Sequence, residues 1–365
     1  MHLHSALRSM ALAALAVAVS VSAAAQTYTY STLYSFKNNR KDPANPPFLV
    51  PSFLILGADG NLYGTSSEGG IYGGGTVFEV TPIGQLRVVH NFKPTTTLDA
   101  PNSLARQVKT GNLFGTTTTD VFKLTRGAKG GYTFSTLYSN SAAELASGTL
   151  DSAGNSYGTD EKCNPDACVF EIPAGGTWTD IFDLGSQTTD SLLGNIIINS
   201  AGDLYVSASN RGVGPNGWVQ EIGGNFSTFS DTGTFPDSLR QDAAGNIYGL
   251  ATSDASSSGS YGNIFKIDTN GTVSVIYSFT DGSQPMGSFS VDSAGIIFGT
   301  AVAADESGFV FKVTPSGQES VLQTFSSSTF NMGLVMDKTG NIYGVTCGSG
   351  GTSGEGTVYK LTITQ

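Results

Sequence analysis

Histidine, the side chain best suited to proton transfer near neutral pH, is scarce in this chain. His2 and His4 lie in the first residues, and His90 is the only other one. Acid–base catalysis by a histidine pair, or a metal site built from several imidazoles, needs more than one ring in one place. Outside residues 1–25 the sequence therefore excludes both.

Carboxylates at turns form a second group with possible chemistry. An acidic residue, or Asn in one case, stands three positions before a repeated Gly, and such a series could suggest calcium. However, Asp at the start of a turn commonly accepts hydrogen bonds from its own backbone, and the dense oxygen spacing of an EF-hand-like loop is absent. We expect turn caps and no cofactor, with calcium as an alternative that no motif supports. The residues are Asp151, Asn199, Asp242, Asp292 and Asp337.

Other acidic residues fall in the long connections between repeated segments. Pairs of carboxylates could act as general acid and base, and solvated loop charge is the simpler interpretation. They are Glu68, Asp160, Glu161, Asp254, Asp305, Glu306 and Glu355.

Cysteines and glycines offer little further chemistry. Cys163 and Cys168 lie in one polar loop, where export would make a disulfide plausible, and Cys347 is interpreted as a loop thiol. A zinc site would need more ligands at regular spacing. The glycine-rich stretch 69–75 lacks the Lys-Ser/Thr pair of a phosphate loop, and no Gly-x-Ser-x-Gly elbow of a hydrolase occurs.

A short phrase that must position these groups recurs seven times, 43 to 51 residues apart. It consists of a turn Gly, a polar or aliphatic pair, an aromatic and often Gly-Thr. One hypothesis is that the aromatics form a ring of stacking platforms for a sugar or another planar ligand. Since every repeat needs the residue, we favour packing between repeats. The seven aromatics are Tyr63, Phe114, Tyr157, Tyr205, Tyr248, Phe298 and Tyr343.

A second phrase, such as Val77-Phe78-Glu79-Val80, follows each copy after a variable loop and alternates apolar with charged residues. Each repeat then holds four strands, A to D, with the aromatic on B and the second phrase on C. Repeats of this length are those of propeller blades. We therefore predict an all-β fold, a seven-bladed β-propeller of four-stranded antiparallel blades.

The ends of the chain predict how the ring closes. The seventh repeat stops after its strand C, whereas residues 26–36 contain a strand that resembles strand D of the second repeat, Tyr132–Ser139. The N-terminal strand should complete the last blade, which leaves no open edge at the seam.

The first 25 residues have the features of a secretory signal. A basic residue, Arg8, precedes the apolar run 10–21, and Ala23-Ala24-Ala25 provides a cleavage site before Gln26. The run is shorter than the roughly 20 residues of a transmembrane helix. We expect residues 1–25 to be a signal peptide, residues 26–365 to be one domain without a membrane span, and the protein to be secreted or periplasmic.

The formal net charge of −11 disfavours nucleic acid as a partner, because an acidic surface repels phosphate backbones. The same charge also keeps a protein soluble, and we expect a monomer.

The repeat phrases resemble a known family. Leu62-Tyr63-Gly64-Thr65 with Gly75-Thr76-Val77-Phe78, and Gly356-Thr357-Val358-Tyr359 near the end, are similar to the Gloeo/Verruco repeat of exported bacterial proteins. This resemblance implies export and tandem-repeat architecture, and no activity. The Asp-x-x-Gly-Asn turn is more loosely similar to streptogramin-lyase-like and NHL-type propellers, and a site of the lyase type would require further histidines.

Function is expected where the chain varies. The B-to-C loops and D-to-A connections emerge on one face and vary most, and rigid scaffolds carry function on such loops. We expect a binding or structural module at or outside the cell surface, with that face contacting a protein or glycan. A propeller lyase, lactonase or glycan hydrolase that uses carboxylates or calcium is the alternative. The fourth repeat departs from the pattern at Val206, Trp218 and Gln220, which indicates either function or drift.

Overall fold

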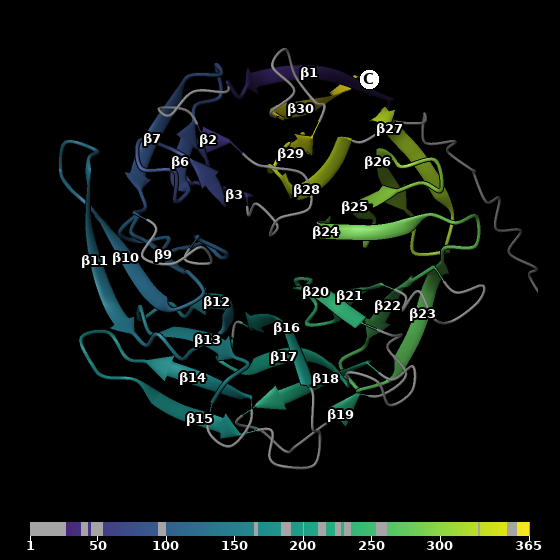
Figure 1. Ribbon diagram of the computed structural model, residues 1–365. Coiled ribbons are helices and arrows are strands. Elements are labelled where there is room, and N and C mark those ends of the chain that lie inside the picture. The colour runs from purple at the N-terminus through teal and green to yellow at the C-terminus, as the bar shows by residue number, and fades with distance from the viewer. Residues whose placement is uncertain are drawn as a thin grey trace, which may run out of the picture.

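The structure is a computed structural model that describes residues 27–37, 43–44, 54–93, 100–163, 167–183, 191–199, 201–210, 217–222, 228–229, 235–252, 261–327, 329–348 and 356–364. Seven four-stranded antiparallel sheets stand around a common axis, and no helix occurs in these ranges (Figure 1). The predicted seven-bladed β-propeller is confirmed. The expected signal peptide, residues 1–25, lies outside the described residues.

Each blade runs outward from strand A, next to the axis, to strand D at the rim. The A strands are β3 (Leu54–Leu56), β8 (Ala105–Arg106), β12 (Leu145–Leu150), β16 (Ser191–Ile198), β20 (Phe235–Gln241), β24 (Gln284–Val291) and β28 (Thr329–Met336). The B strands are β4 (Leu62–Ser66), β9 (Leu113–Thr116), β13 (Ser156–Asp160), β17 (Leu204–Asn210), β21 (Ile247–Thr252), β25 (Ile297–Val302) and β29 (Ile342–Gly348).

The C strands carry the second repeated phrase, and the D strands form the rim. The C strands are β6 (Thr76–Val80), β10 (Asp120–Arg126), β14 (Cys168–Ile172), β18 (Gly217–Ile222), β22 (Asn263–Ile267), β26 (Ser307–Val313) and β30 (Thr357–Thr364). The D strands are β7 (Leu86–Asn91), β11 (Tyr132–Ser139), β15 (Thr179–Asp183), β19 (Thr228–Phe229), β23 (Val273–Ser278), β27 (Glu319–Ser327) and β1 (Thr27–Ser35). A short pair, β2 (Pro43–Ala44) with β5 (Glu68–Gly69), lies beside the first blade.

The two ends of the chain meet in the seventh blade. Strand β1 pairs antiparallel with β30 from Thr27 opposite Thr364 to Ser35 opposite Thr357. Phe36 follows β1 and is buried against Phe78 of the first blade, with ring centroids 5.4 Å apart. The predicted closure is therefore confirmed, and it joins the seventh blade to the first as well as one end to the other.

The hydrophobic core lies between blades. Seven clusters of buried residues occur, and each contains residues of two adjacent blades. A sheet with two apolar faces is stable only when both are covered, and the ring covers all of them.

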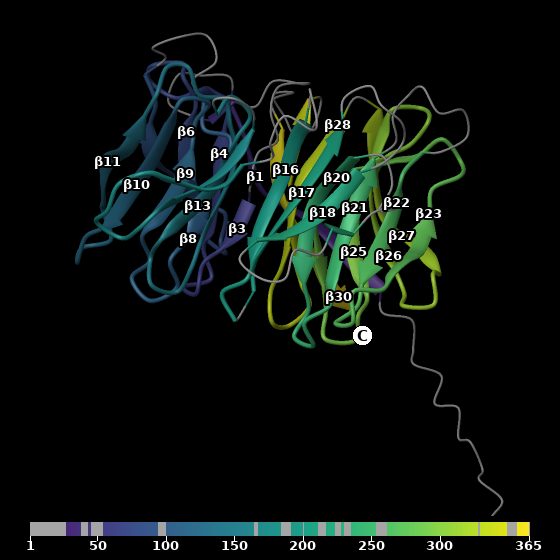
Figure 2. The same ribbon diagram turned by 90° about the horizontal axis from the view of Figure 1, so that it is seen from below.

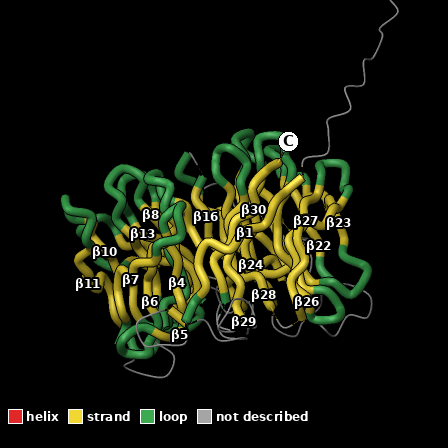
Figure 3. Tube along the Cα trace, turned by 90° about the horizontal axis from the view of Figure 1, so that it is seen from above, coloured by secondary structure: helices red, strands yellow, loops and turns green. Residues whose placement is uncertain are grey.

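Turns and loops emerge at the two ends of the strands (Figures 2 and 3). We call the end with the A-to-B and C-to-D turns, such as Asp242–Gly245 and Asp268–Gly271, the turn face. The opposite end, with the B-to-C and D-to-A connections, is the loop face. Cys347, interpreted from sequence as a loop thiol, instead lies buried on β29, because this B strand extends to Gly348 at the loop face.

Candidate functional site

The seven repeated aromatics lie on the B strands, with their rings between blades. Five are buried, namely Tyr63, Phe114, Tyr248, Phe298 and Tyr343, and Tyr157 and Tyr205 are partly buried. Tyr63 packs with Leu113 and Phe122 of the second blade, and Phe298 packs with Ile342 of the seventh. These rings fill the core between blades, and Tyr205 also borders a cleft at the turn face.

The hydroxyl groups of four of these tyrosines donate to turn carboxylates. The Tyr343 hydroxyl lies 3.1 Å from Oδ2 of Asp337, and Oδ1 of Asp337 accepts from the backbone N–H of Asn341 at 3.0 Å. Tyr248 with Asp242, Tyr157 with Asp151 and Tyr63 with Asp59 form the same contact. Because protein donors occupy these carboxylate oxygens, the arrangement is that of turn caps.

Hydrogen bonds outweigh desolvation at the Asp337 cap. Burial alone would raise the pKa of Asp337, but hydrogen bonds from Asn341 and Thr339 lower it below its ordinary value. In the other direction, burial and the nearby Asp337 raise the pKa of Tyr343 to about 12. Both groups are thus held in the protonation state that a cap requires at neutral pH.

The residue on strand C opposite each aromatic is Glu or Lys: tyrosine faces either one, whereas phenylalanine faces only Lys. Where this residue is Glu, the aromatic is Tyr, as in Tyr157 opposite Glu171, and the hydroxyl donates to the carboxylate at 3.1 Å. Phe occurs only opposite Lys, as in Phe114 opposite Lys123, where the ammonium lies 5.2 Å from the ring centroid. A phenyl ring can attract a cation by its face but cannot satisfy a buried carboxylate.

The first blade uses a carboxylate that the sequence pattern missed. Gly57 occupies the capping position, and Asp59, two residues later, accepts from Tyr63 at 3.0 Å. Asp59 also forms ion pairs with Arg126 at 2.9 Å and Arg106 at 3.5 Å, both from the second blade. Its displaced position within the turn hid it from a comparison of repeats, and only the structure shows that it links two blades.

His90 is built into an aromatic cluster. It lies on β7, with its ring stacked on Phe134 at a centroid distance of 4.1 Å and edge-on to Phe92 at 4.8 Å. Burial lowers the pKa of His90, so the imidazole is neutral at pH 7. This histidine packs between two blades and has no geometry for proton transfer to a ligand.

On the turn face, a cleft of about 710 Å³ lies between the fourth and fifth blades. Tyr205 and Glu221 line one side, and the turns that begin at Asp242 and Asp268 line the other. The cleft is polar, but Asp242 and Asp268 cap their own turns through the N–H groups of Asn246 and Thr272.

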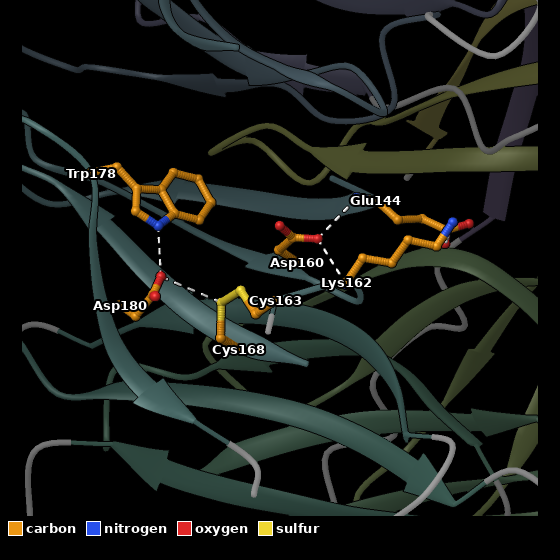
Figure 4. The surroundings of a disulfide bond; sticks show 7 residues. All are labelled: Glu144, Asp160, Lys162, Cys163, Cys168, Trp178 and Asp180. Carbon is orange, nitrogen blue, oxygen red and sulfur yellow. Dashed lines mark hydrogen bonds and ion pairs between the residues drawn. A yellow bond between two sulfur atoms is a disulfide. The ribbon is translucent and has the colours of Figure 1, made fainter. Parts of the chain in front are cut away.

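On the loop face, the B-to-C connection of the third blade is clamped by a disulfide between Cys163 and Cys168 (Figure 4). Oδ1 of Asp180 lies 3.6 Å from Sγ of Cys168 and accepts from Nε1 of Trp178 at 2.6 Å. Cys163 and Cys168 could bind a metal together with Asp180 only if both cysteines were thiolates. The disulfide between them prevents this.

Beside the disulfide, Asp160 is buried at the end of β13. Its Oδ1 accepts from the backbone N–H groups of Glu144 and Lys162, both at 2.9 Å, and the side chains of these two residues form an ion pair at 2.8 Å. Asp160 therefore holds two connections of the loop face together and is not a solvated loop charge.

Glu161 follows Asp160, and its backbone N–H donates to the carbonyl of Glu144 at 3.0 Å. The other acidic candidates that the structure describes lie in other blades. Glu68 lies on β5 of the first blade, and Asp305 and Glu306 form a tight turn in the sixth. Asp254 and Glu355 lie outside the described residues.

The first blade carries an exposed apolar pair on its B-to-C loop. Ile71 and Tyr72 are 47% and 48% exposed, and the ammonium of Lys93 lies 4.8 Å from the Tyr72 ring centroid. The N–H of Ile71 donates to Oδ1 of Asn91 at 3.0 Å, which fixes the loop on the end of β7. This apolar and cationic pair is displayed on a supported loop.

Comparison with known proteins shows the fold. No family model and no curated protein matches the sequence. A streptogramin B lyase structure is 14% identical with a TM-score of 0.65, covering 92% of this chain and 98% of that chain. A catalytically inactive virginiamycin B lyase from Staphylococcus aureus with quinupristin is 12% identical with a TM-score of 0.65, covering 92% of this chain and 100% of that chain.

A puromycin hydrolase is also similar, at 11% identity and a TM-score of 0.56, covering 86% of this chain and 53% of that chain. At these identities the likeness extends to the propeller fold alone. Separately, none of the described residues forms a helix with the length and hydrophobicity that a bilayer crossing requires.

Proposed function

We propose that this protein is an exported binding module that recognises a protein or glycan through the loop face of its propeller. The observation that carries the proposal is the exposed pair of Ile71 and Tyr72, with Lys93 over the tyrosine ring. Tyrosine has an apolar body and a polar tip, and it is enriched where proteins bind partners. An exposed aromatic on a supported loop loses little conformational freedom on binding.

Two further features support recognition rather than catalysis. The disulfide and the Asp160 contacts fix the loop of the third blade, so both loops are presented by a rigid scaffold. His90 and the turn carboxylates are engaged in packing and capping.

The rim supports the proposal that the protein acts as a monomer. In six blades the outermost strand has an extra residue, a β-bulge, where it pairs with the aromatic of strand C, and the sixth blade has a second irregularity. A bulge bends the strand and hinders pairing of its free edge with another molecule. The extra residues are Leu33, Val89, Leu137, Ile181, Ile276 and Leu322.

The binding proposal is tested with residues 26–365 on a glycan panel and against exported proteins of the same cell. Tyr72→Ala should weaken binding of any ligand found by roughly tenfold or more, as expected for an interface aromatic. Val108→Ala is the matched control, because Val108 is 78% exposed on the turn face and should not matter. A ligand whose affinity is unchanged by Tyr72→Ala and reduced by Val108→Ala would overturn the assignment of the face.

Catalysis is the second candidate, favoured by the lyases and the hydrolase among solved structures with this fold. Asp160 is the carboxylate best placed for it, since it is buried at the loop face. Turnover of a lactone, glycan or cyclic peptide substrate that Asp160→Asn abolishes without unfolding the protein would favour the enzyme.

The proposal of export rests on the signal-like residues 1–25, the resemblance to the Gloeo/Verruco repeat and the disulfide, which persists in oxidising compartments. Mass spectrometry of protein from a bacterial host should find an N-terminus at Gln26 and Cys163 linked to Cys168. A cytoplasmic product that begins at Met1 with both thiols reduced would contradict it.

A further inference from the structure

Arg240 is a charged residue at a position where the other blades have none. It lies on β20, the strand next to the axis, two residues before Asp242 opens the A-to-B turn. The side chain is therefore near the axis of the ring, at the turn face. The equivalent residues in the other blades are Ile55, Ala105, Thr149, Ile197, Ser290 and Val335.

Among the residues that the structure describes, no carboxylate forms an ion pair with Arg240. The described part of the chain contains four arginines, and the other three are ion-paired: Arg87 with Glu79, and Arg106 and Arg126 with Asp59. No such pair includes Arg240 within that part.

The contacts of Arg240 are few and local. Nη1 donates to the backbone carbonyl of Leu239 at 2.8 Å, and the guanidinium carbon lies 5.8 Å from the ring centroid of Phe289 on β24 of the sixth blade. Burial lowers the pKa of the Arg240 guanidinium, which remains charged at neutral pH. The side chain still has partial access to solvent.

A guanidinium has five N–H donors in a planar fork, and one of them has a partner among the described residues. The charge is partly buried without a counter-charge in that part of the chain, so an anion from solution that paired with it would be stabilised. We propose that Arg240 is the anchor of an anion site at the turn face, beside the axis of the ring, which binds the carboxylate group of a small ligand.

Two features favour a carboxylate over a phosphate or a polyanion. The open N–H groups of one guanidinium match the two oxygens of a carboxylate, and Phe289 provides an apolar surface beside them. The formal net charge of −11 opposes multiply charged anions. The site is distinct from the loop-face surface of the proposed function, and either can fail without the other.

The test compares thermal unfolding of residues 26–365 in sodium acetate and in sodium chloride at equal ionic strength and pH 7. Acetate should raise the Tm of the wild type saturably, because a ligand that binds only the folded state stabilises it. Arg240→Met, of similar length and without charge, should show no difference between the salts. Arg126→Met removes an ion-paired arginine of the second blade and should keep the wild-type response to acetate.

Calorimetric titration of acetate and of phosphate keeps the test decisive if Arg240→Met does not fold. Arg240→Lys retains the charge without the fork and should weaken acetate binding by roughly tenfold. Equal Tm values of the wild type in acetate and chloride, or an unchanged acetate affinity in Arg240→Lys, would refute the site. Tighter binding of phosphate than of acetate would refute the carboxylate assignment.

Discussion

Val206 and Gln220 face each other across β17 and β18, at positions where the other six blades pair a glycine with an aromatic ring. The ring needs the glycine: a Cβ on Gly249 would lie 2.1 Å from Cζ of Phe265. In the fourth blade Gln220 takes the place of the ring. Val206, whose side chain is buried, takes the place of the glycine on the opposite strand. The other pairs are Gly64–Phe78, Gly115–Phe122, Gly158–Phe170, Gly299–Phe311 and Gly344–Tyr359.

The fourth blade also differs at its rim. In the other blades the bulge of the outermost strand lies beside this aromatic ring, as at Val310/Phe311 in the sixth blade. In the fourth blade Val219 pairs with Phe229 and Gln220 with Thr228, without a shift. The departures at Val206 and Gln220 are thus a matched packing change, and they do not themselves indicate a binding site.

The pairing predicts strong coupling between the two positions. Gln220→Phe should lower the free energy of unfolding by about 1–3 kcal/mol, because the ring would overlap Val206. Val206→Gly alone should also destabilise, by about 1–3 kcal/mol, through lost apolar contacts and backbone entropy. The double variant restores the pattern of the other blades and should lose clearly less than the sum, as measured by denaturant unfolding at equilibrium.

Val206→Gly combined with Leu62→Ala is the control for this cycle. Both residues are buried, but they lie in the fourth and first blades and in separate core clusters, so the two losses should add. Additive losses for Val206→Gly and Gln220→Phe would show that the pair is not compensated.

The fold could be predicted from the sequence because the same short motifs recur in every blade. The turn glycines and the Val-Phe phrase recur with every blade, and Thr27–Ser35 resembles strand D of another repeat, so both the number of blades and the closure could be inferred. Contacts between blades were not accessible in this way. Asp59 bonds two arginines of the next blade, and Cys347 is buried by an extended strand. Neither of these occurs in the other repeats, so a comparison of repeats could not show them.

The seam predicts that the N-terminal strand stabilises the whole ring. Deletion of residues 26–36 removes β1 from β30 and Phe36 from the core between the seventh and first blades, so cooperative unfolding should shift to markedly lower temperature. Phe36→Ala alone should cost about 3–5 kcal/mol, as for a buried aromatic. Leu137→Ala, at a residue of β11 that is 38% exposed, should cost less than about 1 kcal/mol. Calorimetry that found equal melting for the deletion and the full protein would contradict closure.

The Tyr343–Asp337 contact predicts structural caps without calcium. Tyr343→Phe should lower the free energy of unfolding by about 1 kcal/mol, the net value of one hydrogen bond. Asp337→Ala should cost more, since Asn341 and Thr339 lose their acceptor as well. The sixth blade is the internal comparison, because its aromatic is Phe298. There Asp292 caps the turn without a hydrogen bond from a tyrosine hydroxyl. Calcium and EDTA should leave the Tm unchanged, and a calcium-dependent rise that Asp337→Ala removes would argue for a metal site.

His90 predicts a pH dependence of stability near neutrality. Burial lowers its pKa below the ordinary value of about 6.5, so the unfolded chain takes up a proton at higher pH than the folded protein does. The contribution of the neutral ring is complete above pH 6.5 and is lost as the pH falls through the pKa of the folded state. His90→Phe keeps an aromatic ring beside Phe134 and Phe92 and removes the titration. The difference in unfolding free energy between the wild type and His90→Phe should thus be constant above pH 7 and grow in favour of the variant as the pH falls below about 6.5, before most carboxylates titrate near pH 4. A difference that stays constant from pH 8 to pH 5 would mean that His90 is solvated in both states, and that the stacked geometry does not persist in solution.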